Sequence, residues 1–467
     1  MIRQSHPPEG APEPIGRRTR RWRGRLGHAS GGRLDRGWAR AAAAWRRTGG
    51  LLVLLAALPG WLAVAGCGGG DAALVARIDA ALASAAEYLV ARQGADGAWS
   101  ATVQKDRLDR PSVTSHVVSC LYFLPPPGGG RREAYRRGLA YLSRLADDDG
   151  RLAGGVALAH PVYTAAEASR MAVLPDRTPE HVRTQLAWLA VLSRFQHTEA
   201  LGWKPADDDY GGWGLSRTVP MKPRPGGVPV AGSFANLSAT LYGVAAYRST
   251  DGPTRRSACA KALTFIRRCQ NYADDPARAD PRFDDGGFFF CLSVPEMNKA
   301  GVAGTDSAGV ERYHSYGSMT ADGLRGLLAC GLDRSGPRVR AARKWLTDHF
   351  SVTRHPGRFT PETEWMREAF YYYYVWAVSH AWLHAEPRHL RTPRGRVDWP
   401  AALAEELMRR QRRDGSWANS AVEAFEDDAL VATPWAASAL AICRFVVAGD
   451  PPGAGPCQTG PSGKRPQ

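Results

Sequence analysis

Two carboxylates four residues apart open a long aromatic segment, Glu364 and Glu368. Residues with this spacing are neighbours on one face of a helix. Close carboxylates raise one another's pKa, so such a pair can act as a general acid and a general base. We expect a candidate ligand funnel that consists of His314, Tyr316, Asp322, Glu364, Trp365, Glu368 and Tyr371. The aromatic members can equally belong to a packed core. If the residues do form a site, the pattern favours ligand binding over catalysis.

A second acidic group, Glu426-Asp427-Asp428, directly precedes the apolar segment that starts at Ala429. Carboxylates are favoured at a helix N-terminus, where backbone N–H groups lack partners and the helix dipole is positive. Helix capping is therefore one interpretation of this group. Acid catalysis by Asp427 and Asp428 is the other.

The histidines and cysteines show no metal-ligand spacing. Asp284, Cys291 and His314 could meet only by chance, since they follow no known zinc pattern. The Gly-x-Ser-x-Gly and His-Glu-x-x-His motifs do not occur in the sequence. We therefore expect neither a metal nor a cofactor.

A pattern of two consecutive helices recurs along the sequence. The candidate residues are therefore expected on or next to helices. An amphipathic segment is followed by a Gly-rich turn with an aromatic residue, and then by a segment rich in Ala, Ser and Leu. The first helices are predicted near 78–93, 136–145, 182–196, 257–270, 339–349 and 401–411, and their partners near 112–124, 163–174, 234–247, 315–330, 364–383 and 429–446. The small residues of the second set predict closely packed inner helices.

The turn carries the sharpest signature of the repeat. Its two best copies are Gln93-x-x-x-Gly97-x-Trp99 and Gln411-x-x-x-Gly415-x-Trp417. Glycine permits the backbone to leave the helix, glutamine can satisfy unpaired backbone groups, and the aromatic ring fastens the turn to the helix. Two such copies about 320 residues apart, with degenerate copies between them, indicate a repeat architecture.

These motifs resemble the QW repeats of squalene and oxidosqualene cyclases. From Ile78 to about Val447 the chain resembles the terpenoid cyclase and protein prenyltransferase superfamily, with its prenyltransferase and squalene oxidase repeat. The resemblance implies an all-α (α/α)6 toroid of about six helical hairpins. Its ligand funnel would lie at the N-terminal ends of the inner helices, and the pair that begins at Ala401 would pack against the pair that begins at Ile78.

The resemblance also suggests a reaction. Cyclases of this kind protonate an alkene with an Asp-x-Asp-Asp motif at the start of an inner helix, and here Phe425-Glu426-Asp427-Asp428 occupies that place. Asp427 and Asp428 match the motif, whereas Phe425 replaces its first aspartate. The zinc ligands of protein prenyltransferases have no counterpart near Glu311–Thr320, so zinc-dependent prenyl transfer is disfavoured.

The N-terminal region indicates export. Leu51–Gly66 is an uncharged apolar stretch after Arg46-Arg47, and Val64-Ala65-Gly66-Cys67 resembles the lipobox of bacterial lipoproteins, in which Cys67 is lipidated. An uncleaved membrane anchor is the alternative. Both interpretations predict a membrane-anchored protein that faces the periplasm or the cell surface.

The formal net charge of +16 does not indicate nucleic-acid binding. The first 50 residues contain 12 arginines and 3 acidic residues, and the remaining basic residues are scattered. We expect a basic, disordered leader over 1–50, a signal or anchor over 51–67, a linker over 68–76, the toroid over 77–449 and a disordered tail over 450–467.

The leading functional hypothesis is a membrane-tethered toroid that binds a small molecule or a protein in its funnel, without established catalysis. A terpene cyclase-type isomerase that uses an acidic residue is the alternative. A carbohydrate-active (α/α)6 enzyme with Asp322, Glu364 and Glu368 as inward carboxylates is the second alternative.

Overall fold

The computed structural model describes residues 67–124, 129–171, 178–250, 252–385 and 387–449, which lie in one compact unit, Leu62–Gln467. The predicted leader, most of the signal or anchor, and the tail lie outside the described residues. Cys67 is the first described residue and begins a helix, although nothing is described of its side chain. The predictions on these segments therefore stay predictions.

Within the described residues the chain is helix-rich. Six inner helices are α2 (Arg110–Phe123), α4 (Pro161–Met171), α6 (Leu237–Tyr247), α8 (Gly317–Ala329), α11 (Tyr371–Ala385) and α13 (Ala429–Ala448). Six outer helices are α1 (Cys67–Val90), α3 (Gly129–Ser143), α5 (Pro179–Ser193), α7 (Pro253–Arg268), α9 (Pro337–Asp348) and α12 (Trp399–Arg410). Each helix expected from the sequence has a counterpart, and the short α10 (Met366–Ala369) is additional.

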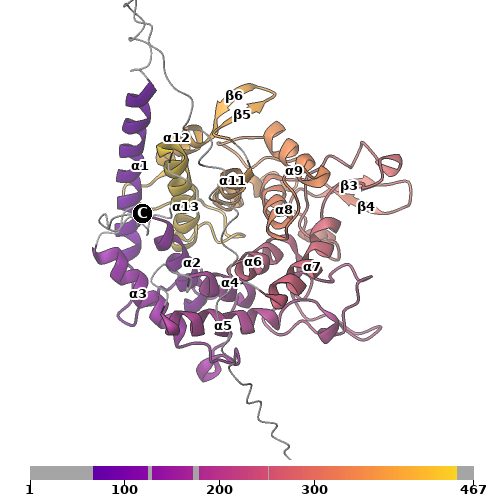
Figure 1. Cartoon of the computed structure of the whole chain (residues 1–467), viewed down its shortest axis with the longest axis horizontal. Helices are drawn as coiled ribbons and strands as arrows, with labels where there is room; N and C mark the ends of the chain where they lie inside the picture. The colour runs from indigo at the N-terminus through magenta and orange to yellow at the C-terminus, as the bar shows by residue number, and fades with distance from the viewer. Residues whose placement is uncertain (1–66, 125–128, 172–177, 251, 386, 450–467) are drawn as a thin grey trace, which may run out of the picture. The chain divides into compact units, whose positions relative to one another are not determined.

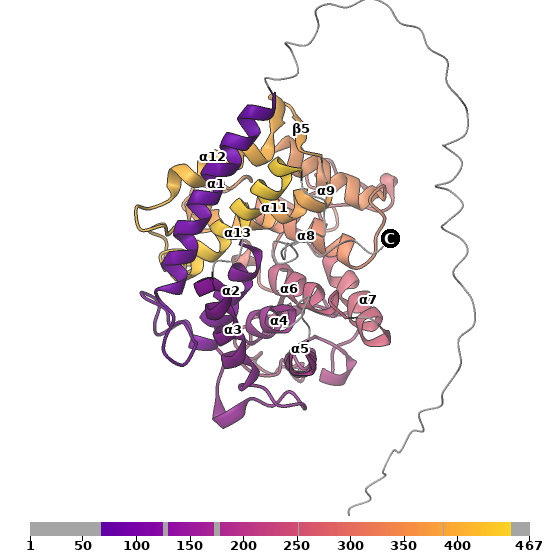
Figure 2. The same ribbon diagram turned by 60° about the vertical axis from the view of Figure 1, so that its left-hand side comes forward.

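The inner helices contact one another in cyclic order. Each of α2, α4, α6, α8, α11 and α13 packs on the next, and α13 packs on α2 (Figure 1). The outer helices lie against this inner set, and α1 runs alongside α12 and α13 (Figure 2). The first helix of the unit is therefore in contact with the last two.

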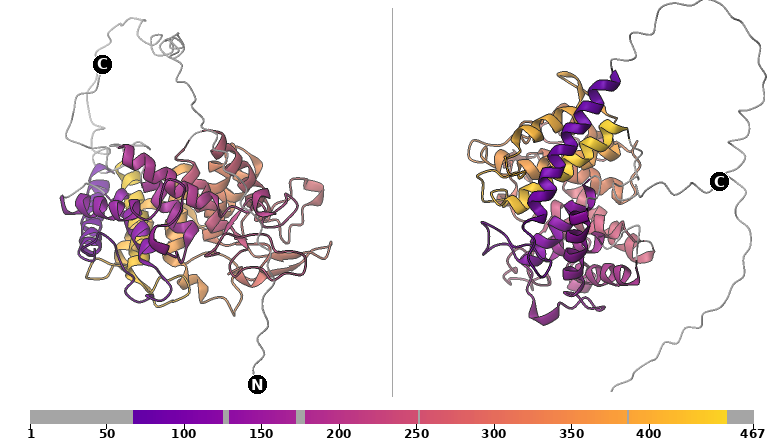
Figure 3. Two further views of the ribbon diagram at one scale, coloured as in Figure 1. Left: turned by 90° about the horizontal axis from the view of Figure 1, so that it is seen from below. Right: turned by 90° about the vertical axis from the view of Figure 1, so that its left-hand side faces the viewer.

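Short strand pairs lie in the connections between the helices, and Figure 3 shows the unit from two further sides. Strand β1 (Trp213–Gly214) pairs antiparallel with β2 (Ala235–Asn236), β3 (Val302–Thr305) with β4 (Glu311–Tyr313), and β5 (His389–Thr392) with β6 (Gly395–Asp398). The first two pairs belong to the two longest connections between helices. They give these connections ordered backbone.

Four turns share one set of hydrogen bonds. Gln93, Gln196, Gln270 and Gln411 each donate from Nε2 to the carbonyl of the turn glycine and to a carbonyl of the next outer helix in the cycle, at 2.8–3.0 Å. The glutamine thus joins its own turn to the neighbouring helix pair.

The aromatic residue of each turn is also held in a repeated way. The backbone N–H groups of Trp99, Trp213, Phe288 and Trp417 donate to the hydroxyls of Thr114, Thr240, Thr320 and Thr433 on the inner helices, at 2.9–3.1 Å. All four aromatic side chains are fully buried. The recurring inner-helix threonine was not recognised in the sequence, although its position repeats there.

The expected linker over 68–76 is instead part of α1. Asp71 in this segment forms a bidentate ion pair with Arg388, at 2.7 Å for both contacts. The structure thus places this segment in the first turns of a helix, with Asp71 held by Arg388 from the connection between α11 and β5.

The apolar α13 passes the length and hydropathy test for a membrane span. Most of this helix is buried among α1, α2, α11 and α12, as expected for an inner helix. Its composition is therefore explained by packing within the unit.

Candidate functional site

A cavity of about 490 Å³ lies where the N-terminal halves of the six inner helices meet. Every inner helix contributes at least one side chain to its wall. Its aromatic lining consists of Tyr163, Tyr242, Phe290, Tyr316, Phe370, Tyr373, Phe425 and Trp435. The volume is within the range of roughly 300–1,000 Å³ that is usual for small-molecule sites. The site is thus an aromatic chamber formed by helices from the whole unit.

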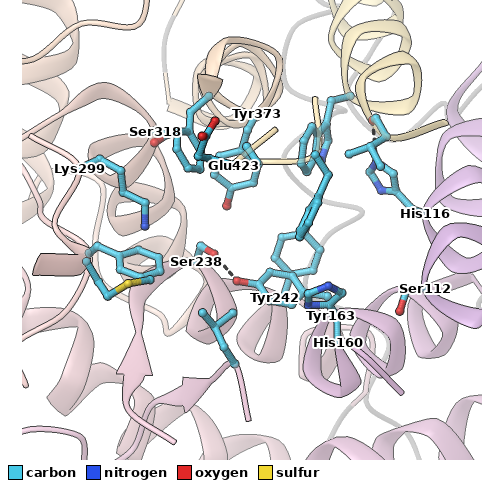
Figure 4. A pocket seen from close by; sticks show the side chains of 18 of the residues that line it. Ser112, His116, His160, Tyr163, Ser238, Tyr242, Lys299, Ser318, Tyr373 and Glu423 are labelled. Atoms are coloured by element: carbon cyan, nitrogen blue, oxygen red, sulfur yellow. Dashed lines mark hydrogen bonds between the residues drawn. The ribbon is translucent and has the colours of Figure 1, made fainter. Parts of the chain in front are cut away.

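The rings of the wall hold one another in place. Tyr163 meets Tyr242 edge to face with centroids 4.8 Å apart, and Tyr373 meets Trp435 in the same way at 5.1 Å. The Tyr163 hydroxyl is 2.5 Å from Ser238 Oγ, a hydrogen bond that is drawn in Figure 4. Such contacts keep ring faces fixed toward the cavity, where they can contact an apolar ligand or stabilise a positive charge.

The two longest connections complete the wall. Leu215 comes from the connection before α6, and Phe290, Met297 and Lys299 come from the connection before α8. Long ordered connections in a compact domain usually carry function. Here they cover the same cavity that the inner helices form.

A paired acid and base face the cavity from α2 and α4. His116 Nδ1 is 3.0 Å from Glu167 Oε1, and His116 Nε2 is 3.1 Å from the Val431 carbonyl oxygen. Since a carbonyl oxygen only accepts, Nε2 must carry a proton. The Nδ1 contact then requires either a charged imidazolium beside a carboxylate or a neutral imidazole beside a protonated Glu167. In both cases the pair holds a proton that it could donate.

Of the seven residues expected in the funnel, Tyr316 lines the cavity. Glu364 and Glu368 are exposed and form ion pairs with Arg367 at 2.6 Å and Arg410 at 3.1 Å. They lie before α11, on α10 and the turn that leads into it. The i,i+4 spacing therefore did not bring two carboxylates into the cavity.

The remaining expected residues also lie outside the cavity lining. Trp365 is 46% exposed, whereas Tyr371 is fully buried and donates its hydroxyl to the Val352 carbonyl at 2.6 Å. His314 lies after β4 and is partly buried. None of these three residues is part of the cavity lining.

Asp322 is fully buried behind the wall. It accepts a hydrogen bond from the Tyr373 hydroxyl at 2.5 Å and lies 3.2 Å from Arg325 Nη1. Burial raises the pKa of Asp322 to about 7, although Arg325 and Tyr373 oppose this shift. Asp322 thus orients a lining tyrosine without lining the cavity itself, and none of the three carboxylates expected for the carbohydrate-active alternative lines the cavity.

Asp427 and Asp428, expected as catalytic, also lie outside the lining. Asp428 caps α13 by accepting from Leu430 N at 2.9 Å, and it accepts from the backbone N–H groups of Thr102 and Val103 at 2.6 and 2.8 Å. Asp427 accepts from the Gln104 side chain at 2.7 Å. Both carboxylates are thus held against the connection between α1 and α2.

The preceding glutamate is a helix cap as well. Glu426 is fully buried and accepts from the backbone N–H groups of Tyr372 and Tyr373 in the first turn of α11, at 3.0 and 2.8 Å. Burial raises the pKa of Glu426 well above its usual value, against these hydrogen bonds. The acidic triplet thus serves two helix starts.

Phe425 is the member of this segment that does line the cavity. Its φ of 61° is the only positive value among the described non-glycine residues. Arg107 lies over its ring, 4.4 Å from the centroid. Strained backbone of this kind persists where surrounding structure over-determines it, and here it places an aromatic ring where the cyclase motif would have an aspartate.

The chain matches no family model and no curated protein. Solved structures do match it. A variant of the type II terpene cyclase MstE from Scytonema in complex with merosterolic acid A (product) shares 14% identity over 80% of this chain and 99% of that chain, with a TM-score of 0.50. Another MstE variant, in complex with geranylgeranyl dihydroxybenzoate (substrate), shares 13% identity over the same portions, with a TM-score of 0.50.

The chain has a terpenoid cyclase-like fold. At 13–14% identity this likeness shows the fold alone. It agrees with the helix-rich architecture described above. The residues of the cavity must therefore be interpreted from their own geometry.

Sequence reasoning missed His116, Glu167 and Lys299. His116 and Glu167 are on different helices, 51 residues apart, so no local motif joins them. Lys299 lies in a long connection without periodicity. A weak signal was available, since Lys299 is one of only seven lysines in a chain with 54 arginines.

Proposed function

We propose that the protein is an (α/α)6 toroid with QW-type turns that binds an apolar, polyprenyl-type ligand in its central cavity. The observation that carries the proposal is the wall, in which all six inner helices present aromatic or aliphatic side chains to one space. Burial of an apolar chain there stabilises the complex by about 25 cal/mol per Å² of apolar surface. The fold supports the proposal, because the matching MstE structures contain a geranylgeranyl compound or its product.

Binding can be tested by obstructing the cavity. Leu215→Trp adds a large side chain to the wall and should weaken the binding of geranylgeraniol at least tenfold, measured by quenching of tryptophan fluorescence. Leu186→Trp is the matched control, because Leu186 is 56% exposed on α5 and remote from the lining. Equal affinity of both variants and the wild type would show that the ligand binds elsewhere.

Acid-initiated cyclisation is the second candidate function. The specific observation in its favour is the proton held between His116 and Glu167 at the cavity wall. A proton delivered from this pair to an alkene would create a carbocation, which the surrounding ring faces would stabilise. In this proposal Glu167 and His116 replace the aspartates of the cyclase motif.

Turnover would be measured by liquid chromatography coupled to mass spectrometry with geranylgeranyl dihydroxybenzoate, since the cyclised product has the mass of the substrate but a different retention time. Glu167→Gln should lower the rate by roughly 10²–10⁴-fold, the usual contribution of general acid catalysis. Glu423→Gln should not, because Glu423 is an exposed lining carboxylate without a histidine partner. Loss of activity in Asp427→Asn but not in Glu167→Gln would overturn this assignment.

We also propose that the protein is exported and tethered to a membrane through Cys67. The support is the lipobox-like Val64-Ala65-Gly66-Cys67 after an apolar segment. Lipid-dependent processing should be sensitive to globomycin and lost in Cys67→Ser. Processing that persists in this variant would favour a different signal or an anchor.

A further inference from the structure

Lys299 brings an amine to an otherwise apolar part of the cavity. It lies in the connection between α7 and α8, after the short helix Pro295–Met297, and its side chain lines the cavity (Figure 4). Its Nζ lies over the Phe290 ring, 3.2 Å from the centroid, and 5.4 Å from the centroid of Phe370. Aromatic faces therefore surround the amine.

The amine has no carboxylate partner among the residues that the structure describes. Other lysines near aromatic rings differ in this respect. Lys222, 5.9 Å from the Trp203 ring centroid, has both oxygens of Asp207 at 2.7 Å, and Lys261 beside Tyr210 pairs with Glu199. A buried ammonium without a counter-charge is costly, so the neutral amine is favoured.

Burial of Lys299 also favours its neutral amine form. Burial lowers the pKa of Lys299 to about 7, whereas the nearby Cys291 thiol and the faces of Phe290 and Phe370 oppose this shift, because ring faces attract the charged form. Burial raises the pKa of Cys291 to about 12, so this thiol stays uncharged near neutral pH. A substantial fraction of Lys299 is therefore unprotonated and nucleophilic at neutral pH.

We propose that Lys299 forms an imine with the carbonyl group of an apolar aldehyde or ketone bound in the cavity. The proposal rests on the proposed function, because the apolar body of this ligand occupies the aromatic chamber. It deepens that function by specifying the reactive group of the ligand.

The reaction balances without an oxidant or a reductant. The Nζ lone pair attacks the carbonyl carbon, a C–N bond forms, and the carbonyl oxygen takes up a proton. The resulting carbinolamine loses its hydroxyl group and the second amine proton together as one water molecule, and a C=N bond remains. The apolar wall limits the return of water, which would hydrolyse the imine.

The test uses the full-length chain with farnesal as the probe, followed by reduction with cyanoborohydride and peptide mass spectrometry. We expect one reduced adduct, located on Lys299, that forms at least tenfold faster than any adduct on Lys344. Lys344 is the internal control, because its side chain is 76% exposed on α9. Equal labelling of both lysines would overturn the proposal.

Two variants separate imine formation from simple charge attraction. Lys299→Met and Lys299→Arg should both lose the adduct, and Lys299→Arg keeps the positive charge. The Lys344→Met variant should retain the adduct. If farnesoic acid binds at least tenfold more tightly than farnesol while no farnesal adduct forms, Lys299 is a charge partner and the imine proposal is wrong.

Farnesol distinguishes failure of this inference from failure of the proposed function. It has the same apolar body and no carbonyl group, so it should bind to the wild type and to Lys344→Met, whose substitution lies outside the cavity, with affinities within about threefold of each other. Farnesol binding without a farnesal adduct would overturn the imine alone. Absence of binding for both probes would overturn the proposed function as well.

Discussion

His355 is a buried imidazole behind the cavity wall, with 1% of its surface exposed. Its Nε2 accepts from Ser318 N at 2.9 Å, at the start of α8, and its ring stacks on Tyr374 with centroids 4.9 Å apart. Burial, assisted by the positive charges of Arg367 and Lys299, lowers the pKa of His355 to about 3. The folded protein therefore holds this histidine neutral.

This residue makes stability depend on pH. In the unfolded chain the pKa of histidine is about 6.5, so below that pH the unfolded state takes up a proton that the folded state resists. The stability contributed by neutral His355 is complete above pH ~6.5 and is lost as the pH falls toward about 3. The slope from this residue is at most ~1.4 kcal/mol per pH unit.

His355→Gln removes the titration and keeps an acceptor for Ser318 N. We expect its free energy of unfolding to fall less than that of the wild type between pH 6.5 and pH 4, measured by urea denaturation. Parallel pH profiles of the two proteins would contradict the assignment. The comparison is between slopes, so a constant cost of the substitution does not affect it.

At the scale of elements, the turn glycines connect neighbouring helix pairs. Gly97, Gly211, Gly286 and Gly415 all have φ between 84° and 93°, a region that other residues rarely adopt. A Cβ atom at Gly211 would also overlap the carbonyl of Lys261 on α7. These turns thus need glycine for two reasons, namely the backbone conformation and the approach of the next outer helix.

Gly211→Ala should therefore destabilise the protein by more than the cost of placing alanine at a positive φ. Gly226→Ala is the matched control, because Gly226 has φ 77° but no atom within 4 Å of an added Cβ. We expect a loss of about 1 kcal/mol for the control and of at least 2–3 kcal/mol for Gly211→Ala, measured by chemical denaturation. Equal losses would show that the helix approach contributes little.

At the scale of the whole molecule, several contacts join the two ends of the described unit. Gln411 Nε2 donates to the Ala81 carbonyl at 2.9 Å, and Arg444 pairs with Asp79 at 2.7 Å. Asp428 accepts from the backbone of Thr102 and from its hydroxyl. An open helical array needs polar end repeats, whereas here the first and last helix pairs cover each other.

Substitution of Asp428 measures how much the contacts between the first and last helix pairs contribute to stability. Asp428→Ala removes a helix cap and the carboxylate that accepts from the connection between α1 and α2, so we expect a loss of more than about 2 kcal/mol. Asn236→Ala removes only the corresponding cap of α6, which accepts from Ala239 N at 2.9 Å, and should cost about 1 kcal/mol. Thermal and urea unfolding would report the difference.

If Asp428 only joins the first and last helix pairs, its substitution should not affect ligand binding. The affinity of Asp428→Ala for geranylgeraniol should change little under conditions in which the variant is folded, because Asp428 does not line the cavity. A folded variant that is as stable as the wild type but has lost turnover would instead support a catalytic role.

The helices and their turns could be predicted from local patterns in the chain. Helix periodicity and the Gln-x-x-x-Gly-x-Trp spacing are local patterns, so they predict the helices and turns without any knowledge of the contacts that each turn makes with the next outer helix. The twelve long helices followed from these patterns. Small residues on the second helix of each pair correctly indicated which helices pack in the interior.

Which side chains face the cavity depends on contacts between residues that are far apart in the sequence. A carboxylate before an apolar helix has the same sequence whether it caps the helix or delivers a proton, and the backbone N–H groups of Thr102 and Val103 that decide the case of Asp428 lie more than 300 residues away. His116 meets Glu167, and Lys299 reaches the aromatic wall, through contacts of the same non-local kind. Local periodicity places residues on helices, but the chemistry of the cavity depends on which helices and connections converge.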